Sequence, residues 1–330
     1  MYKPPYIITE QMLKLISDIS EKVGKIQGYH TLSTHPNLQR SNRIRSIHSS
    51  LAIEANSLSL AEVRDVIDGR TVIGNRDEIK EVQNAYRAYE AIQEINPFNM
   101  EDLKRMHGVM TDGLVPECGK FRSGEEGVFD GYGCIFMAPP AKLVTGQMND
   151  LFEWMNREKE NVHPLIMSSV FHYEFVFIHP FADGNGRMAR LWYTALLYGW
   201  RELFQYVPFE SQIRNCQSEY YEVIARCHKN GDSDEFIMFI LKRLDAVLGE
   251  VLSKPAVLYE NTTAQVERLM ETMEFDIPYT AVQLMGALGL KSRKSFRENY
   301  LQPAIEDEII EMTIPDKATS RNQRYVMKKK

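Results

Sequence analysis

The sequence has few cysteines and no long uninterrupted hydrophobic run. Its four cysteines include no CxxC pair, which excludes a disulfide scaffold and favours a reducing compartment. No apolar stretch reaches the roughly 18 residues that a membrane-spanning helix needs. Residues 1–6 lack the charged and apolar regions of a signal peptide. The sequence therefore predicts a cytoplasmic protein without membrane contact.

The sequence also lacks a strong charge of one sign. Lys and Arg number 39 and Asp and Glu number 45, so the net charge is −6 at pH 7. Such a protein does not coat nucleic acid as a whole, although a local basic patch is allowed. With 44% hydrophobic and 25% charged residues, disorder over most of the chain is excluded. A length of 330 residues predicts two domains.

Hydrophobic periodicity predicts a mainly α-helical chain. Apolar positions recur at helical spacing in the segments 9–26, 41–55, 58–68, 77–94, 100–113, 143–157, 164–178, 185–200, 211–228 and 233–253. Residues 114–140 differ, because glycines separate short β-branched and aromatic pieces there. The sequence Asp130-Gly131-Tyr132-Gly133 is a turn signal, so a β-hairpin is predicted over Gly127–Met137.

The tail, residues 256–330, has its own order. It predicts helices over 263–273, 281–288 and 292–301, with Thr280 as an N-cap, followed by two short strands around a turn at 316–322. This is the order of a small winged helix-turn-helix domain. The tail has eleven acidic and eleven basic residues. Its basic residues crowd the third helix and the wing, which leaves contact with DNA or with a protein open.

Residues 179–190 read His-Pro-Phe-Ala-Asp-Gly-Asn-Gly-Arg-Met-Ala-Arg. Pro180 ends a helix whose segment 168–178 we interpret as amphipathic, so His179 is expected at a helix end facing a loop. A second helix is expected to begin near Asn185. The free N–H groups and partial positive charge at its start favour a phosphate.

The side chains around this loop suggest a division of roles. Arg187 and Arg190 share one helical face and add two positive charges. Asp183 can bind a Mg²⁺ ion held by a polyphosphate, and His179 can accept a proton near neutral pH. A metal site built on His172, His179 and Asp183 is the competing interpretation. About 10.5 Å of helical rise between the two histidines argues against it, so we expect His172 to pack between helices.

The string from His179 to Arg190 resembles the Fic motif, HPFx(D/E)GNGRxxR, at every defined position. The resemblance implies a Fic helical bundle with a β-hairpin flap, and an enzyme that transfers AMP from ATP to a Ser, Thr or Tyr hydroxyl of a protein. It implies that His179 is the base, that Phe181 anchors the loop and that Asp183 binds Mg²⁺. The residues that it assigns to ATP phosphates are Gly184, Asn185, Gly186, Arg187 and Arg190, with the last on the γ-phosphate.

Residues 50–54 resemble the inhibitory helix of Fic proteins, (S/T)xxxE(G/N), with Ser50 and Glu54 at the defined positions. In the family this Glu pairs with the second motif arginine, here Arg190, and blocks the γ-phosphate position. Ala55 departs from the expected Gly or Asn. We expect Asn56 to end the helix in a left-handed conformation instead. In some relatives the same Glu supports removal of AMP.

Further roles follow from the same resemblance. The hairpin matches the flap, whose side chains Val128, Phe129, Ile135 and Phe136 are expected to dock the target by strand-like pairing. Tyr221, of the pair Tyr220-Tyr221, is expected near the adenine. A further family position, often Asn, could fall on His228 or Asn230.

These expectations divide the chain into an N-terminal helical region, 1–95, with the inhibitory helix at about 41–56, a Fic core, 96–255, and a winged-helix domain, 256–330. We predict an autoinhibited protein adenylyltransferase that uses ATP and Mg²⁺ and is capable of self-modification. The alternatives are a nucleotide-sensing regulator acting through the winged helix, a de-AMPylating enzyme, or use of another nucleotide donor. The partner is a protein with a modified hydroxyl, and the sequence leaves open whether the chain forms a homodimer.

Overall fold

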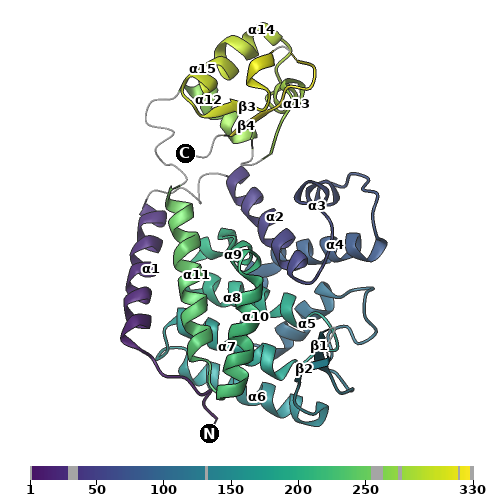
Figure 1. Ribbon diagram of the computed structural model, residues 1–330, viewed down its shortest axis with the longest axis vertical. Coiled ribbons are helices and arrows are strands. Elements are labelled where there is room, and N and C mark those ends of the chain that lie inside the picture. The colour runs from purple at the N-terminus through teal and green to yellow at the C-terminus, as the bar shows by residue number, and fades with distance from the viewer. Residues whose placement is uncertain are drawn as a thin grey trace. The chain divides into compact units, whose positions relative to one another are not determined.

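The computed structural model describes residues 2–28, 36–130, 133–253, 263–273, 277–318 and 320–327, with the backbone alone at 36–37, 128–130, 133–136, 253, 267 and 271. The described chain is mainly α-helical, and its strands form two separate two-stranded antiparallel sheets (Figure 1). The fold class predicted from the sequence is therefore confirmed.

Before residue 254 the structure describes α1 (Glu10–Gly28), α2 (Pro36–Ile53), α3 (Leu60–Ile67), α4 (Arg76–Glu90), α5 (Met100–Met110), α6 (Ala141–Glu158), α7 (Pro164–Ile178), α8 (Asn185–Trp200), α9 (Phe209–Asn215), α10 (Gln217–Asn230) and α11 (Asp234–Ser253). Local capping fixes several helix starts. Ser59 and Glu62 form a capping box at α3, and the Asn75 side chain accepts the N–H of Asp77 at α4.

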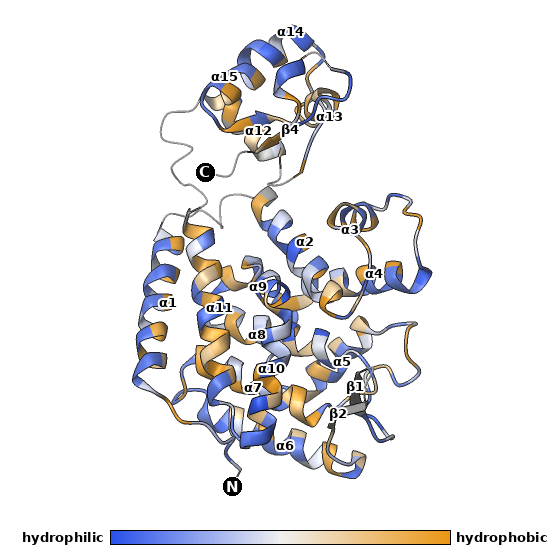
Figure 2. Ribbon diagram, in the orientation of Figure 1, coloured by the Kyte–Doolittle hydropathy of each residue, from blue (hydrophilic) through white to orange (hydrophobic). Residues whose placement is uncertain are grey.

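Helices α7 and α8 form the centre of the bundle and pack against each other more extensively than any other pair of described elements. Every α7 residue from Leu165 to Phe175 is buried, including the polar His172 and Glu174. The prediction that 168–178 is amphipathic was wrong, because a helix surrounded by others is hydrophobic on all sides. Figure 2 shows α7 and α11 coloured largely as hydrophobic.

The predicted ends of the two central helices are confirmed at 164–178 and 185–200. The predicted helix 211–228 is instead two helices, α9 and α10, separated at Cys216. Cys216 has a non-helical backbone, with φ −125° and ψ 36°, and its Sγ accepts a hydrogen bond from Arg243 Nη1 at 3.1 Å. No proline or glycine marks this break, so the sequence pattern runs through it.

The predicted hairpin is confirmed as β1 (Gly127–Asp130) and β2 (Gly133–Met137). The strands are antiparallel, with Gly127 opposite Met137 and Val128 opposite Phe136. The register then shifts between Val128 and Phe129, which is a β-bulge. In Figure 1 the hairpin lies beside α5 and above α6.

The tail contains α12 (Ala264–Thr272), α13 (Ala281–Ala287), α14 (Arg293–Phe296), α15 (Gln302–Glu306), β3 (Ile310–Met312) and β4 (Tyr325–Met327), with one π-helical turn between α14 and α15. The predicted N-cap is confirmed, since Thr280 and Gln283 form a capping box. Strand β3 pairs with β4 as the wing. The hydrophobic core of the tail includes Leu269, Leu284, Phe296, Ala304 and Ile309.

The chain divides into two compact units, Met1–Glu21 with Arg43–Leu248, and Lys22–Asn42 with Gly249–Lys330. The candidate site described below lies wholly in the first unit. Among the described residues, no helix is both long enough and apolar enough to cross a membrane.

Candidate functional site

The loop between α7 and α8 places His179 at the C-terminal end of α7. Pro180 disfavours helical backbone at the residue before it, and His179 adopts a left-handed conformation with φ 52° and ψ 59°. Its N–H still donates to Phe175 O at 3.0 Å. The prediction that His179 lies at a helix end is confirmed, and a left-handed non-glycine residue is the kind of local strain found at functional sites.

The surroundings of His179 keep its imidazole neutral. Burial lowers the pKa of His179 below its ordinary value of 6.5, because a charged ring loses hydration there. Its Nδ1 lies 3.4 Å from Val176 O. A carbonyl oxygen only accepts hydrogen bonds, so this contact places the proton on Nδ1 and leaves Nε2 as an acceptor. A neutral imidazole of this kind can take a proton from a hydroxyl.

Phe181 anchors the loop in the core, as predicted. It is fully buried and stacks on His107, with ring centroids 3.7 Å apart and planes 5° apart. His107 Nδ1 accepts the N–H of Gly119 at 2.9 Å, so its Nε2 carries the proton in the 3.0 Å hydrogen bond to Asp183 O. Burial lowers the pKa of His107 to about 4. His107 thus holds the loop as a neutral ring, and no sequence motif indicated it.

The N-terminus of α8 has the geometry of the anion site that the sequence predicts. Gly184 has φ 80° and is the N-cap, and the first intrahelical hydrogen bond runs from Met188 N–H to Gly184 O. The N–H groups of residues 185–187 precede that bond and are available to an anion. The Asn185 side chain is used differently, because it bonds both the N–H and the carbonyl of Phe181. The Asn185 side chain therefore fixes the loop, and only its backbone N–H is left for the predicted contact with a phosphate.

Arg190 is buried and bound by the α2 residues that the sequence singled out. Its Nε donates to Ser50 Oγ and its Nη2 donates to Ser50 O, both at 2.9 Å, and Nη2 also donates to Glu54 Oε1 at 2.7 Å. Burial alone would lower the pKa of Arg190, but the charge and hydrogen bond of Glu54, together with Tyr220 and Tyr89, outweigh this and raise it. Arg190 is therefore a fixed positive charge already paired with a carboxylate.

Glu54 also lies directly over the anion site. A Cβ atom built on Gly186 would collide with Glu54 Oε1. Only glycine leaves room for the carboxylate here. The Glu54 oxygen thus occupies the space above the helix N-terminus where a bound phosphate oxygen would be placed.

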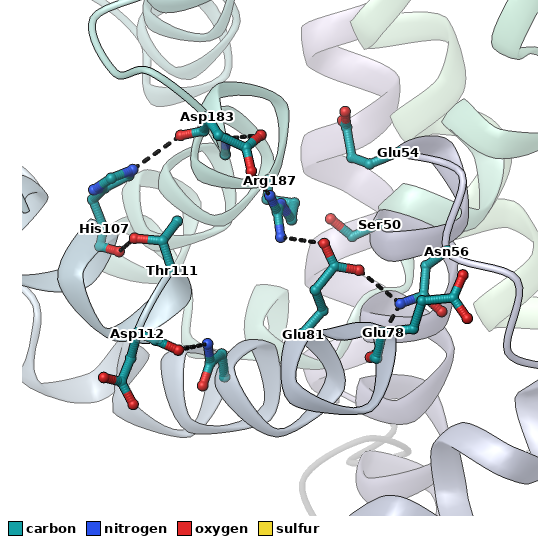
Figure 3. Close-up of polar contacts among 12 residues, drawn as sticks. Ser50, Glu54, Asn56, Glu78, Glu81, His107, Thr111, Asp112, Asp183 and Arg187 are labelled. Atoms are coloured by element: carbon teal, nitrogen blue, oxygen red, sulfur yellow. Dashed lines mark hydrogen bonds and ion pairs between the residues drawn. The ribbon is translucent and has the colours of Figure 1, made fainter. Parts of the chain in front are cut away.

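Arg187 lies beside this space with donors to spare. Its Nη2 donates to Asp183 Oδ2 and its Nη1 to Glu81 Oε1, each at 2.9 Å (Figure 3). Its Nε is buried and has no hydrogen-bond partner in the described chain. A phosphate oxygen would satisfy this group, which supports the assignment of Arg187 to phosphate binding.

The predicted metal ligand, Asp183, has a side chain that is 56% exposed. The described residues contain no cluster of three or more His, Cys, Asp or Glu side chains suited to a metal. Mg²⁺ usually keeps several waters and combines one or two carboxylates with substrate phosphates. One accessible carboxylate beside an anion site therefore fits Mg²⁺ bound together with ATP.

The end of α2 differs from the expectation. Ala55, not Asn56, takes the left-handed conformation, with φ 66°. The N–H of Ala55 donates to Ala52 O and that of Asn56 donates to Leu51 O, which is a Schellman motif with Ala55 at the position that glycine prefers. The prediction for Asn56 was wrong because Asn56 uses its side chain instead, bonding Glu78 O and Glu81 Oε2.

The two tyrosines of α10 have different surroundings. Tyr220 is buried and its hydroxyl lies 2.9 Å from His172 Nε2, so His172 packs between helices as predicted. Tyr221 is 45% exposed, and its placement near the adenine stays a prediction.

The further family position was left open between His228 and Asn230. His228 lines a cavity of about 330 Å³ together with Ile178, the residue before His179. Asn230 does not line it.

Arg122 joins the β1–β2 hairpin to the loop that carries His179, and it was not predicted as a site residue. It is 3% exposed. Its guanidinium donates to the carbonyls of His179 and Gly124 at 2.7 and 2.8 Å, and also to those of Pro139 and Ile178. The proposed docking side chains Val128, Phe129, Ile135 and Phe136 lie outside the described side chains, so their role stays a prediction.

The fold and site together define a mainly helical protein in which a helix N-terminus suited to an anion lies next to a neutral histidine. Comparison with known families agrees. Residues 97–197 match the Fic/DOC family, and residues 264–328 match the C-terminal domain described for the filamentation induced by cAMP protein Fic-like. A solved Fic family protein from Desulfovibrio desulfuricans G20 is 44% identical, covers 100% of this chain and 99% of its own, and superposes with a TM-score of 0.75. The chain belongs to the Fic/DOC family.

More distant relatives carry names for an activity. Protein adenylyltransferase Fic of Nematostella vectensis is 27% identical over 220 residues, which are 64% of this chain and 49% of that protein. Protein adenylyltransferase Fic of Culex quinquefasciatus is 30% identical over 240 residues, 69% of this chain and 45% of that protein. This chain thus spans about half the length of the curated relatives it matches. The solved Fic-1 of Caenorhabditis elegans, 23% identical with a TM-score of 0.60 over 73% of this chain and 72% of its own, shares the fold.

Proposed function

We propose that this protein is an autoinhibited protein adenylyltransferase that transfers AMP from ATP to a hydroxyl side chain of a protein. The observation that carries the proposal is the position of Glu54, bonded to buried Arg190 and seated over Gly186 at the start of α8. A carboxylate in an anion site is costly unless it is paired. Its placement there fits a site built for phosphate and held closed by its own chain.

The site residues can carry out the transfer as follows. The hydroxyl oxygen of the target attacks the α-phosphorus of ATP while Nε2 of His179 takes the hydroxyl proton. The bond from the α-phosphorus to the oxygen that bridges to the β-phosphate breaks, and pyrophosphate leaves. The proton on His179 then passes to water, and AMP stays on the target. Asp183 would hold Mg²⁺, which neutralises phosphate charge when bound.

The same geometry accounts for inhibition. Arg190 has its Nη2 engaged by Glu54 and Ser50, so a γ-phosphate must displace the carboxylate to reach that donor. Both ligands are anions and the site has a fixed positive charge, so they exclude each other by charge as well as by space. ATP is then bound without the contact that orients its phosphates for in-line attack.

Removing the carboxylate tests the proposal. In Glu54→Gly we expect transfer of AMP to protein to rise about 10- to 100-fold, since a hydrogen bond to a charged group contributes about 1.5–3 kcal/mol. Adding His179→Ala should lower that rate by about 10²–10⁴-fold, the usual contribution of a general base. ATP affinity, measured by calorimetry, should change little on adding His179→Ala. Glu54→Gly that binds ATP without transferring AMP would contradict the proposal.

The flap provides the surface on which a target segment is proposed to lie. Strands β1 and β2 form a two-stranded sheet with no further strand in the described chain, so its outer edges are available for main-chain pairing with an extended segment. Such pairing recognises the main chain of the target and not its side chains, so it is compatible with several protein targets and with self-modification.

A further inference from the structure

Glu81, on α4, contacts both the phosphate-binding arginine Arg187 and the end of the inhibitory helix. Its Oε1 accepts from Arg187 Nη1 at 2.9 Å, and its Oε2 accepts from Asn56 Nδ2 at 2.8 Å. Figure 3 shows the Glu81 carboxylate between these two side chains, with one oxygen toward each. A single carboxylate therefore bridges the anion site and the turn that follows Glu54.

The bridge lies largely out of solvent. The Arg187 side chain is 3% exposed and that of Glu81 is 21% exposed, while Asn56 is 8% exposed. An ion pair at such burial is screened far less than a surface pair. Arg187 also faces the carboxylate of Asp183, so its charge is shared between two acids before any phosphate arrives.

Asn56 transmits this contact to the inhibitory residue. It lies two positions after Glu54 and is the last residue of the Schellman turn, since its N–H donates to Leu51 O. Both polar atoms of its side chain are bonded. Nδ2 donates to Glu78 O and to Glu81 Oε2, and Oδ1 accepts the N–H of Leu58 at 3.2 Å. These hydrogen bonds from Asn56 to α4 fix the position at which α2 ends, and they thereby fix the position of the Glu54 carboxylate.

We propose that Glu81 is a positioning residue that couples occupation of Arg187 by phosphate to release of Glu54 from Arg190. This inference rests on the proposed function and adds a second carboxylate to its regulation. A phosphate that draws the Arg187 guanidinium away removes the partner of Glu81 Oε1. The carboxylate then turns from Asn56, and the α2 terminus loosens. By linkage, loosening that terminus strengthens phosphate binding by the same factor.

Glu81→Gln separates coupling from simple support because an amide offers one acceptor and one donor. Its oxygen can still accept from Arg187, but its NH₂ group then faces the NH₂ group of Asn56, and the two donors repel. In the chain with Glu54 intact, we expect AMP transfer to rise about 3- to 10-fold, within the range of measured coupling between sites. In the Glu54→Gly chain the same change should alter transfer by less than about 2-fold, because no brake remains to be released.

A polarity swap gives the sharper test. Asn56→Asp alone places like charges against each other and should also raise transfer. Combined with Glu81→Gln, it restores a donor facing an acceptor between residues 56 and 81, although the bond from Asn56 Nδ2 to Glu78 O stays lost. The double variant should therefore return part of the way toward the wild-type rate and transfer less than either single variant. Additive activation in the double variant would overturn the proposal, as would equal effects of Glu81→Gln with and without Glu54. A fall in transfer after Glu81→Gln would show that Glu81 only supports Arg187.

Nucleotide binding separates this inference from the proposed function. In His179→Ala chains, in which transfer is slowed about 10²–10⁴-fold, we expect Glu81→Gln to tighten ATP binding about 3- to 10-fold by the same linkage. Asp77→Asn is the matched control, because it removes one charge from an exposed position on the same helix and should leave ATP binding unchanged. Tighter ATP binding without AMP transfer in any variant would keep the coupling and reject the transferase. Unchanged ATP binding would reject the coupling.

Discussion

Ala55 is the residue at which this chain departs from the inhibitory pattern of its family, and its backbone explains the family preference. It has φ 66° at the turn that ends α2, a conformation that costs a residue with a Cβ atom about 1–2 kcal/mol. The helix therefore ends where the pattern places its Gly or Asn, and the chain bears the strain there. Asn56 is freed by this to bond α4.

Ala55→Gly should relieve that strain. We expect the free energy of unfolding to rise by about 1 kcal/mol, because glycine adopts a positive φ at little cost. Urea unfolding measures the change. Ala225→Gly, at an exposed position inside α10, is the control and should lower stability by about 1 kcal/mol. Equal destabilisation by both changes would contradict a left-handed Ala55.

Single residues show how far sequence reasoning reaches. The motif predicted His179, Asp183 and the two arginines because each lies within one short string whose spacing fixes its geometry. His107 and Arg122 were missed since they come from distant segments and act through ring nitrogens or a guanidinium on backbone carbonyls. Such contacts leave no spacing rule, because the carbonyl partner can belong to any residue type.

At the level of elements, Arg122 connects the β1–β2 hairpin to the loop that carries His179 through hydrogen bonds to both. It bonds the carbonyls of Ile178 and His179 at the end of α7 and those of Gly124 and Pro139 on either side of the hairpin. The guanidinium fork satisfies carbonyls on both segments at once, which a lysine ammonium does less well.

Arg122→Lys should therefore impair transfer more than nucleotide binding. In the Glu54→Gly chain we expect kcat to fall about 10-fold or more, since misplacing the base and the target surface costs the gain from orientation. ATP affinity should change little, because Arg122 makes no contact with Arg187 or Arg190. Arg226→Lys, an exposed ion-pair residue on α10, should leave both quantities unchanged. A larger loss in ATP affinity than in kcat would contradict this account.

The elements that the sequence predicted best are those with strong local signals. Helices α7 and α8 have proline or glycine at their boundaries, so their ends were predicted to the residue. The break at Cys216 was missed because tertiary contacts set it, and no local breaker accompanies it. The error about α7 has the same origin: periodicity shows that a helix has an apolar face but not that neighbours cover the other faces.

For the whole molecule, histidines that are fully or partly buried set the response to acid. Burial lowers the pKa of every histidine in the described part of the chain, to about 4 in His48, His107 and His228 and about 3 in His172, and also in His163 and His179. Burial instead raises the pKa of Glu174 to about 7 and raises that of Glu210. The histidines, whose lowered pKa opposes folding in acid, thus outnumber the two carboxylates, whose raised pKa favours it.

The free energy of unfolding should consequently decrease as the pH is lowered. Between pH 6.5 and about 4 the unfolded chain binds protons on histidines that the folded chain leaves neutral, so folding is opposed as pH drops. The two buried carboxylates act in the opposite direction but are fewer. The stabilisation is complete above about pH 6.5, the ordinary histidine value. Urea midpoints measured from pH 7 to 5 should decrease steadily, and a constant or rising midpoint would refute this charge assignment.

Charge is also distributed unevenly through the molecule. The tail surface formed by Arg293, Lys294 and Arg297 also carries Glu298 and Glu306, so its charges largely cancel. That surface gives no added support to DNA contact, which stays a prediction. The candidate phosphate site, by contrast, lies in the acidic part of the chain and consists of two arginines and one helix end. Local geometry rather than net charge decides where an anion binds.

The position of the label in ATP tests the central claim most directly. Glu54→Gly is incubated with Mg²⁺ and protein, using ATP labelled either at the α-phosphate or at the γ-phosphate, and acid-stable label on protein is counted. The account predicts strong incorporation of the α-label, none of the γ-label, and little of either with Glu54 intact. Incorporation of the γ-label, or equal incorporation of the α-label with and without Glu54, would contradict an AMP transferase held closed by Glu54.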